Sequence, residues 1–153
     1  MNLAFMNPFD LRTALFARHA QHVVLIHFPI ALYLAGVALD LSALWLKRNH
    51  LAEAAYLNLT LAAFAAVPAA ATGLLAWHWQ LEGQKLKGIL LEHLIAGGGA
   101  AVAICCTWFL HYRARRAGNG LPPARFLLEG LGTIAVVVAG HLGGFLSGVN
   151  VPN

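Results

Sequence analysis

Residues 54–79 read AAYLNLTLAAFAAVPAAATGLLAWHW and contain no Asp, Glu, Lys or Arg. A helix needs about 20 predominantly apolar residues to cross the hydrocarbon core of a bilayer, and this stretch exceeds that length. Three other stretches with few charges are comparably long, at about 20–46, 88–112 and 124–148. The pattern predicts four membrane-spanning helices.

The composition of the whole chain agrees with a protein embedded in lipid. Of its 153 residues, 59% are hydrophobic and 10% are charged, whereas a soluble domain carries about 25% charged residues. Membrane-spanning strands would give alternating segments of about ten residues, and the sequence has none. The short connections predict an all-α, antiparallel four-helix bundle over residues 20–153, with an interfacial helix over residues 1–19 before it.

The positive charges predict the orientation of these helices. The side that carries the N-terminus has four Lys and Arg residues, namely Arg12, Arg18, Lys85 and Lys87. The opposite side has six, namely Lys47, Arg48, Arg113, Arg115, Arg116 and Arg125. Because cytoplasmic loops carry an excess of Lys and Arg, both termini are expected in the periplasm of a bacterium with the chain in its inner membrane. This topology accounts for the net charge of +4, and no nucleic-acid partner is expected.

Eight histidines are spread over the chain: His19, His22, His27, His50, His78, His93, His111 and His141. His50 and His111 are expected at the cytoplasmic ends and therefore solvated or interfacial. His19 and His78 are placed at the periplasmic boundary, with His22 just inside it. His27, His93 and His141 lie six or seven residues from the periplasmic ends of their spans, which is about 9–11 Å deep at 1.5 Å per residue.

Three imidazoles at one depth are the main functional signal. An unpaired polar group in hydrocarbon is costly, so an ionisable side chain at membrane depth is a candidate site. We expect His27, His93 and His141 to face the bundle interior. Neutral imidazole is a ligand for haem iron and also for zinc or copper. A bare metal ion would be expected to draw in carboxylates or cysteines, and of these only Glu92 is near.

Small residues beside these histidines favour haem b over a bare ion, because a flat macrocycle needs clearance next to its ligand. Gly97 follows His93 by one turn, and Gly140 and Gly144 flank His141. His22 and His27 are about 140° apart around one helix and cannot bind the same iron from one face. His22, His27, His93 and His141 are therefore the predicted iron ligands of one or two haems, with their pairing left open.

Two prolines are predicted to bend the first two spans. Pro29 lies two residues after His27, removes a backbone donor and frees a carbonyl near Leu25. The kink could set the orientation of the His27 side chain, or it could only shape the start of the helix. Pro68 is expected to act in the same way in the second span, with no histidine near it.

The sequence also resembles a bacterial family of four-span membrane proteins of unknown function, some of which accompany Rieske-type and cytochrome proteins. The motifs that carry the resemblance are HVVLIHFPIA at 22–31, ATGLLAW at 71–77, LEHLIAG at 91–97 and GHLGGFLSGVNV at 140–151. The chain departs from the family pattern at Val23, where proline is usual, and at Phe145, where the pattern continues into a tyrosine. The resemblance implies that His22, His27, His93 and His141 take part in electron transfer.

Three classes of function follow. The first is a haem b electron-transfer subunit of a larger redox complex, which exchanges electrons with a periplasmic cytochrome or quinone. The second is a structural subunit whose histidines and glycines pack against other membrane subunits. The third is metal or proton transport through Asp40, Glu92 and Glu129, although Asp40 and Glu129 are expected to pair with Arg or to snorkel. The sequence has no nucleophile–base pair, so any enzymatic chemistry would belong to a cofactor.

Overall fold

The computed structural model describes residues 18–80 and 85–148, and these residues form helices without strands. The helices are α2 (Arg18–Leu25), α3 (His27–Leu46), α4 (Asn49–Gln80), α5 (Gly88–Arg116) and α6 (Arg125–Leu146). The predicted all-α four-helix bundle is confirmed. The interfacial helix predicted over residues 1–19 lies outside the described residues, apart from its last two, which begin α2.

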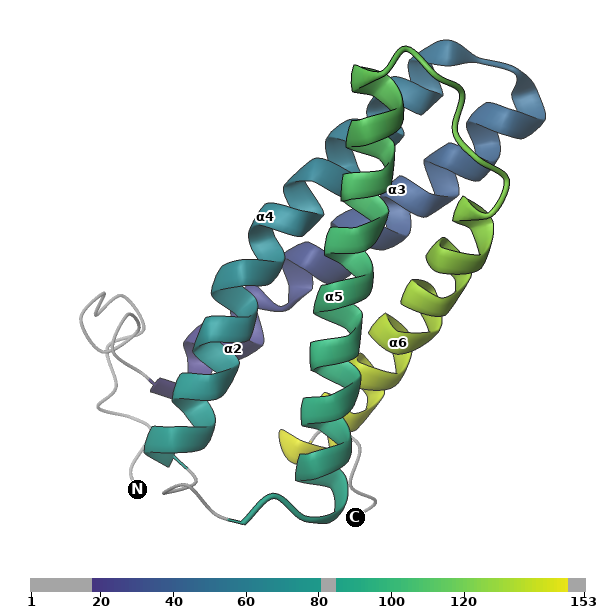
Figure 1. Ribbon diagram of the computed structural model, residues 1–153. Coiled ribbons are helices and arrows are strands. Elements are labelled where there is room, and N and C mark those ends of the chain that lie inside the picture. The colour runs from purple at the N-terminus through teal and green to yellow at the C-terminus, as the bar shows by residue number, and fades with distance from the viewer. Residues whose placement is uncertain (1–17, 81–84, 149–153) are drawn as a thin grey trace.

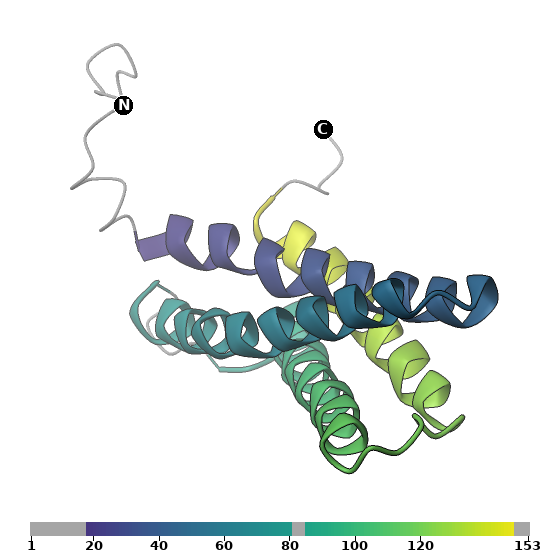
Figure 2. The same ribbon diagram turned by 90° about the horizontal axis from the view of Figure 1, so that it is seen from above.

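The chain runs up and down between two ends of the bundle (Figure 1). We call the end where α2 begins and α6 ends the α2 end. The opposite end, where residues 47–48 and 117–124 connect the helices, is the turn end. Helix α3 packs mainly on α4 and α5 packs mainly on α6, while α4 and α5 join the two pairs. Seen from above, the two pairs run in different directions (Figure 2), so α4 and α5 cross at an angle.

The first span is divided at Ile26, which separates α2 from α3. Pro29 has no N–H with which to bond the carbonyl of Leu25, so the hydrogen-bond ladder loses a rung there. The neighbouring bond from Ile30 N to Ile26 O is long, at 3.4 Å. The kink expected near Leu25 is therefore confirmed. In contrast, α4 continues through Pro68 as one helix.

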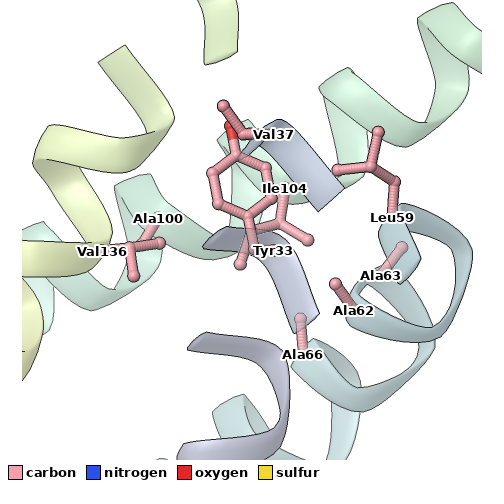
Figure 3. Close-up of a cluster of buried hydrophobic side chains, with 9 residues drawn as sticks. All are labelled: Tyr33, Val37, Leu59, Ala62, Ala63, Ala66, Ala100, Ile104 and Val136. Atoms are coloured by element: carbon pink, nitrogen blue, oxygen red, sulfur yellow. The ribbon is translucent and has the colours of Figure 1, made fainter. Parts of the chain in front are cut away.

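The core is built on one alanine-rich face of α4. Its buried residues follow the spacing of one helix face and are Ala55, Leu59, Ala62, Ala63, Ala66 and Ala69. Tyr33 of α3 is fully buried at the centre of this cluster, with Ile104 of α5 and Val136 of α6 on its other sides (Figure 3). Apolar burial does not drive helices together in lipid, so close van der Waals contact through small residues holds them instead.

Large apolar side chains cover the outside of the bundle. Trp45 is 90% exposed, and Phe64, Leu127 and Ile134 are also exposed. Within the described residues, four helices are long and apolar enough to cross a membrane: Gln21–Leu46, Asn49–His78, Gly88–Arg116 and Arg125–Leu146. A hydrocarbon environment is the solvent that such a surface requires.

Candidate functional sites

Polar side chains gather at two levels of the bundle. Near the α2 end, His22 of α2 and His93 of α5 approach each other. Near the turn end, four buried ionisable side chains lie together, namely Asp40, His111, Arg125 and Glu129. Both histidines of the first group were predicted iron ligands. Of the second group, Asp40 and Glu129 were named for possible transport, and His111 and Arg125 were assigned to no site.

His22 is held in place by α4. Its Nδ1 lies 3.1 Å from the carbonyl oxygen of Ala69 and 3.3 Å from Thr72 Oγ1. A carbonyl can only accept, so Nδ1 carries the proton and donates it to Ala69. The expectation that no histidine lies near Pro68 is wrong, because this carbonyl belongs to the next residue along α4.

His93 is held in the same way by α6. Its Nδ1 lies 3.1 Å from the carbonyl oxygen of Ala139 and donates to it. Each ring therefore has a backbone carbonyl on a neighbouring helix that fixes its tautomer and orientation. Histidines that ligate metals commonly have this kind of support on the nitrogen away from the metal.

The two rings lie close together and each packs against a glycine. Their centroids are 6.4 Å apart, with an angle of 81° between the ring planes. A Cβ atom at Gly73 would lie 2.9 Å from Cε1 of His22, and one at Gly143 would lie 3.2 Å from Cε1 of His93. Both glycines therefore make room for an imidazole, although the sequence analysis did not assign them to the site. The signal was available in the ATG of 71–73 and the GHLGG of 140–144.

His27 and His141 occupy a different surface. Both side chains are exposed, so the expectation that they face the bundle interior is wrong. His27 Nδ1 bonds the carbonyl of Val23 on its own chain segment at 2.6 Å, and the ring of His141 meets Phe145 edge-on. Exposure arises because the 100° step per residue turns His27 away from the face that places His22 on α4.

The predicted cofactor glycines differ in their surroundings. A Cβ atom at Gly97, one turn after His93, would meet no heavy atom within 4 Å. A Cβ atom at Gly140 would lie 4.0 Å from Cδ1 of Ile30, so α3 and α6 approach each other beside His27 and His141. Gly144 is half-buried near the end of α6. Open space beside His93 is what a bulky ligand on that residue would need.

His111 corrects a prediction. It was expected to be solvated or interfacial, but its side chain is 2% exposed. Its Nε2 lies 2.9 Å from Oε1 of Glu129, which is 1% exposed. The α5–α6 hairpin causes this burial, since both residues lie a similar distance from the turn and meet across it. His50 and His78 are exposed.

Asp40 and Glu129 were expected to pair with Arg or to snorkel, and Asp40 does pair with arginine, whereas Glu129 is buried and pairs with His111. Nε of Arg125 donates to Oδ2 of Asp40 at 2.7 Å, and both residues are buried. Arg125 is therefore an internal counter-charge for Asp40, although it was expected to be one of the loop cations. Without it the positive charges number five on one side of the bilayer and four on the other.

Metal-ligating side chains cluster at one place in the described part of the chain. Oxygen and nitrogen atoms of Asp40, His111 and Glu129 lie within 4.8 Å of one another. Within residues 18–80 and 85–148, no third His, Cys, Asp or Glu joins His22 and His93 in such a group. The histidine pair by itself thus lacks the four protein ligands of a structural zinc site.

The fold and its apolar exterior define a multi-pass membrane protein embedded in a lipid bilayer. Residues 18–150 match the family described as "Predicted membrane protein (DUF2231)". The match covers most of the chain, so the chain belongs to this family. No curated protein and no solved structure matches it.

Proposed function

We propose that this chain is a haem b-binding electron-transfer subunit, in which His22 and His93 are the first pair that would hold the haem iron. The observation that carries the proposal is the approach of two imidazoles from helices in different hairpins, each with Nδ1 bonded to a backbone carbonyl. With that nitrogen protonated in a neutral ring, Nε2 is the nitrogen that bears the lone pair.

The spacing of the rings supports coordination of one iron from two sides. Two imidazoles on one metal ion, with bonds of about 2.0–2.1 Å, have centroids roughly 6 Å apart. The observed separation of 6.4 Å fits this requirement. Haem supplies the remaining iron ligands itself, so it suits a site with two histidines better than a bare ion does. A haem held there would supply one-electron redox chemistry.

The role of the chain is to position and shield this pair. Ala69 and Ala139 orient the rings, Gly73 and Gly143 leave space for them, and the open side of Gly97 leaves clearance beside His93. His27 and His141 form a second candidate pair on adjacent helices. Their exposed side chains would need lipid, another membrane subunit or a second copy of the chain to cover a haem there.

The proposed location follows the positive charges. We place the α2 end in the periplasm of a bacterial inner membrane, because the cations of the turn end are the more numerous. The His22–His93 pair then lies on the periplasmic side. This position suits three kinds of electron-transfer partner: a periplasmic cytochrome, quinone within the lipid, or a neighbouring membrane subunit.

An absorption spectrum tests the proposal. The chain is produced with ample haem supply, purified in detergent, and examined by a reduced-minus-oxidised spectrum and by haem quantification. We expect a sharp Soret and α band in the unmodified protein. His22→Ala and His93→Ala should each abolish the α band, while His50→Ala, at an exposed histidine of the turn end, should leave it unchanged.

The number of haems distinguishes the two candidate pairs. One haem per chain that depends on His22 and His93 is the expected result. A second haem lost in His27→Ala or His141→Ala would assign the outer pair as well. A colourless protein, or a haem that persists in both His22→Ala and His93→Ala, would contradict the proposal and favour a structural role.

A further inference from the structure

The four buried ionisable residues near the turn end form a second site that haem binding leaves unused. We call Asp40, His111, Arg125 and Glu129 the quartet. They come from three helices, and each is at most 8% exposed. Asp40, His111 and Glu129 lie four to six residues from the turn ends of their helices, which places them about 6–9 Å inside the bundle.

The charges of the quartet do not balance when His111 is neutral. Asp40 and Glu129 supply two negative charges, and Arg125, which stays protonated in proteins, supplies one positive charge. A single uncompensated negative charge therefore remains in a buried, membrane-embedded site. Such a charge is costly unless it is paired or neutralised.

Glu129 also has an acceptor to spare. Its Oε1 is bonded to His111, but its Oε2 is buried and has no hydrogen-bond partner among the described residues. A buried polar atom without a partner indicates a missing ligand or proton. The unpartnered Oε2 is independent of the charge count, and both observations indicate that a proton or cation is missing beside Glu129.

Among the described residues, the quartet forms two ion pairs, both within itself: Arg125 with Asp40 and His111 with Glu129. From α3, Tyr33 donates its hydroxyl hydrogen to the backbone carbonyl of Glu129 at 3.3 Å, and the same hydroxyl lies 3.3 Å from Thr107 of α5. From α4, Leu59 packs on Gly36, one turn before Asp40. The titratable Tyr56 of α4 lies under Arg115, 4.5 Å from its guanidinium carbon. Tyr33, Thr107 and Leu59 therefore bring no charge to the quartet.

We propose that the quartet is a binding site for one proton, shared between His111 and Glu129. The proton adds to an imidazole nitrogen or to a carboxylate oxygen, and no bond is broken. The pair is then either imidazolium with carboxylate or imidazole with carboxylic acid. In both forms the quartet carries no net charge, and this proposal does not depend on haem binding.

Charge balance favours a proton over a divalent cation. Three ligand atoms within 4.8 Å could surround a metal ion, but a divalent ion beside Arg125 would leave a net positive charge. A proton cancels the excess negative charge, so the site then carries no net charge. The salt bridge from Arg125 to Asp40 stays intact in the protonated site, whereas a metal ion would compete for that carboxylate.

The experiment measures the proton directly in the purified full chain at about pH 8, where exposed histidines and carboxyl groups have released theirs. Nitrogen-15 NMR of the histidine rings detects an imidazolium, and infrared spectroscopy detects a carboxylic acid band. We expect one of these signals in the unmodified protein. Its absence from both spectra would overturn the proposal without any variant.

Two substitutions test the charge balance. Glu129→Gln and Asp40→Asn each remove one negative charge, so each should eliminate the signal and release one proton per chain. Glu53→Gln makes the same chemical change at an exposed position of α4 and should keep the signal. Circular dichroism checks that each variant retains its helices.

Asp40→Asn is the sharper variant because Asp40 makes no hydrogen bond to His111 or Glu129. A signal that persists in folded Asp40→Asn would show a local hydrogen bond without charge coupling and would refute the proposal. Zinc titration provides a further outcome. Stoichiometric zinc binding by the unmodified protein, lost in His111→Gln, would identify a metal site in place of the proton site.

Discussion

Single residues set how closely the helices of this bundle approach, and Gly132 of α6 is the tightest case. A Cβ atom there would collide with the hydroxyl of Tyr33 and would lie 3.2 Å from Cβ of Ala103. Tyr33 is fully buried and its hydroxyl contacts the backbone of Glu129, so it has little freedom to move aside. The absence of one methyl group therefore fixes the distance between α3 and α6 beside the quartet.

We expect Gly132→Ala to destabilise the folded bundle by about 1–3 kcal/mol, the usual cost of forcing extra volume into a packed core. Gly130→Ala is the matched control on the same helix, because a Cβ atom at Gly130 would meet nothing within 4 Å. Unfolding of both variants in mixed detergent micelles, followed by circular dichroism, measures the difference. Equal stability of the two variants would contradict this prediction and would show that the Tyr33 side chain can move aside.

Among the elements, the division of the first span between α2 and α3 has the clearest consequence. Pro29 interrupts the backbone hydrogen bonding, and α2 packs on α4, where His22 reaches Ala69. A straight helix would carry α2 along the axis of α3. His22 and His27 face two different surfaces because they lie about 140° apart around the helix, and beyond the break α2 packs on α4.

We expect Pro29→Ala to restore a donor for the carbonyl of Leu25 and to join α2 and α3 into one helix. The position of α2 relative to α5 should then change. Pulsed electron paramagnetic resonance between spin labels at Val24→Cys and Leu91→Cys, in a background without Cys105 and Cys106, measures this distance. Pro68→Ala is the control, because α4 is already continuous there, and it should leave the distance unchanged.

At the scale of the whole molecule, four spans place polar groups at both ends of an apolar bundle. The histidine pair belongs to the α2 end and the quartet to the turn end. The apolar cluster around Tyr33, drawn in Figure 3, comes from residues that lie between the two along α3, α5 and α6. An even number of spans also puts the start of α2 and the end of α6 on one side (Figure 1). The two proposed sites consequently face opposite sides of the membrane.

We expect the turn end to face the cytoplasm. In the same cysteine-free background, Asn119→Cys marks the turn end and Lys85→Cys marks the α2 end, and both native side chains are exposed. A membrane-impermeant maleimide added to intact cells should label Lys85→Cys alone. Labelling of Asn119→Cys alone would reverse the orientation and move the histidine pair to the cytoplasmic side. Labelling of both positions would contradict the four-span topology.

Much of the fold could be predicted from the sequence because the signals involved are local. Length and apolarity predicted the four spans, and Pro29 predicted the break near Leu25. The ion pair of Asp40 with an arginine was also predictable, since a lone carboxylate in a span needs a cation. The grouping of side chains around each helix was less predictable, because all spans are apolar on every face and no periodicity distinguishes inside from outside.

The histidines illustrate this limit. Their depths follow from sequence position, so His27, His93 and His141 were grouped together. Which face of each helix meets its neighbours depends on how the hairpins cross, and this crossing leaves His27 and His141 outside and brings His22 to His93. The burial of His111 likewise required knowing which face of α5 meets α6.

The sequence by itself determined that this protein is an all-helical membrane bundle with four spans and imidazoles near one end. These properties depend on residue type and on distance along the chain, because a lipid environment requires long apolar helices whatever their packing. Only the tertiary structure decided which polar groups meet: His22 with His93, His111 with Glu129, and Arg125 with Asp40. Such pairings depend on rotation and crossing of helices, which are set by contacts such as Tyr33 against Gly132 between residues far apart in sequence.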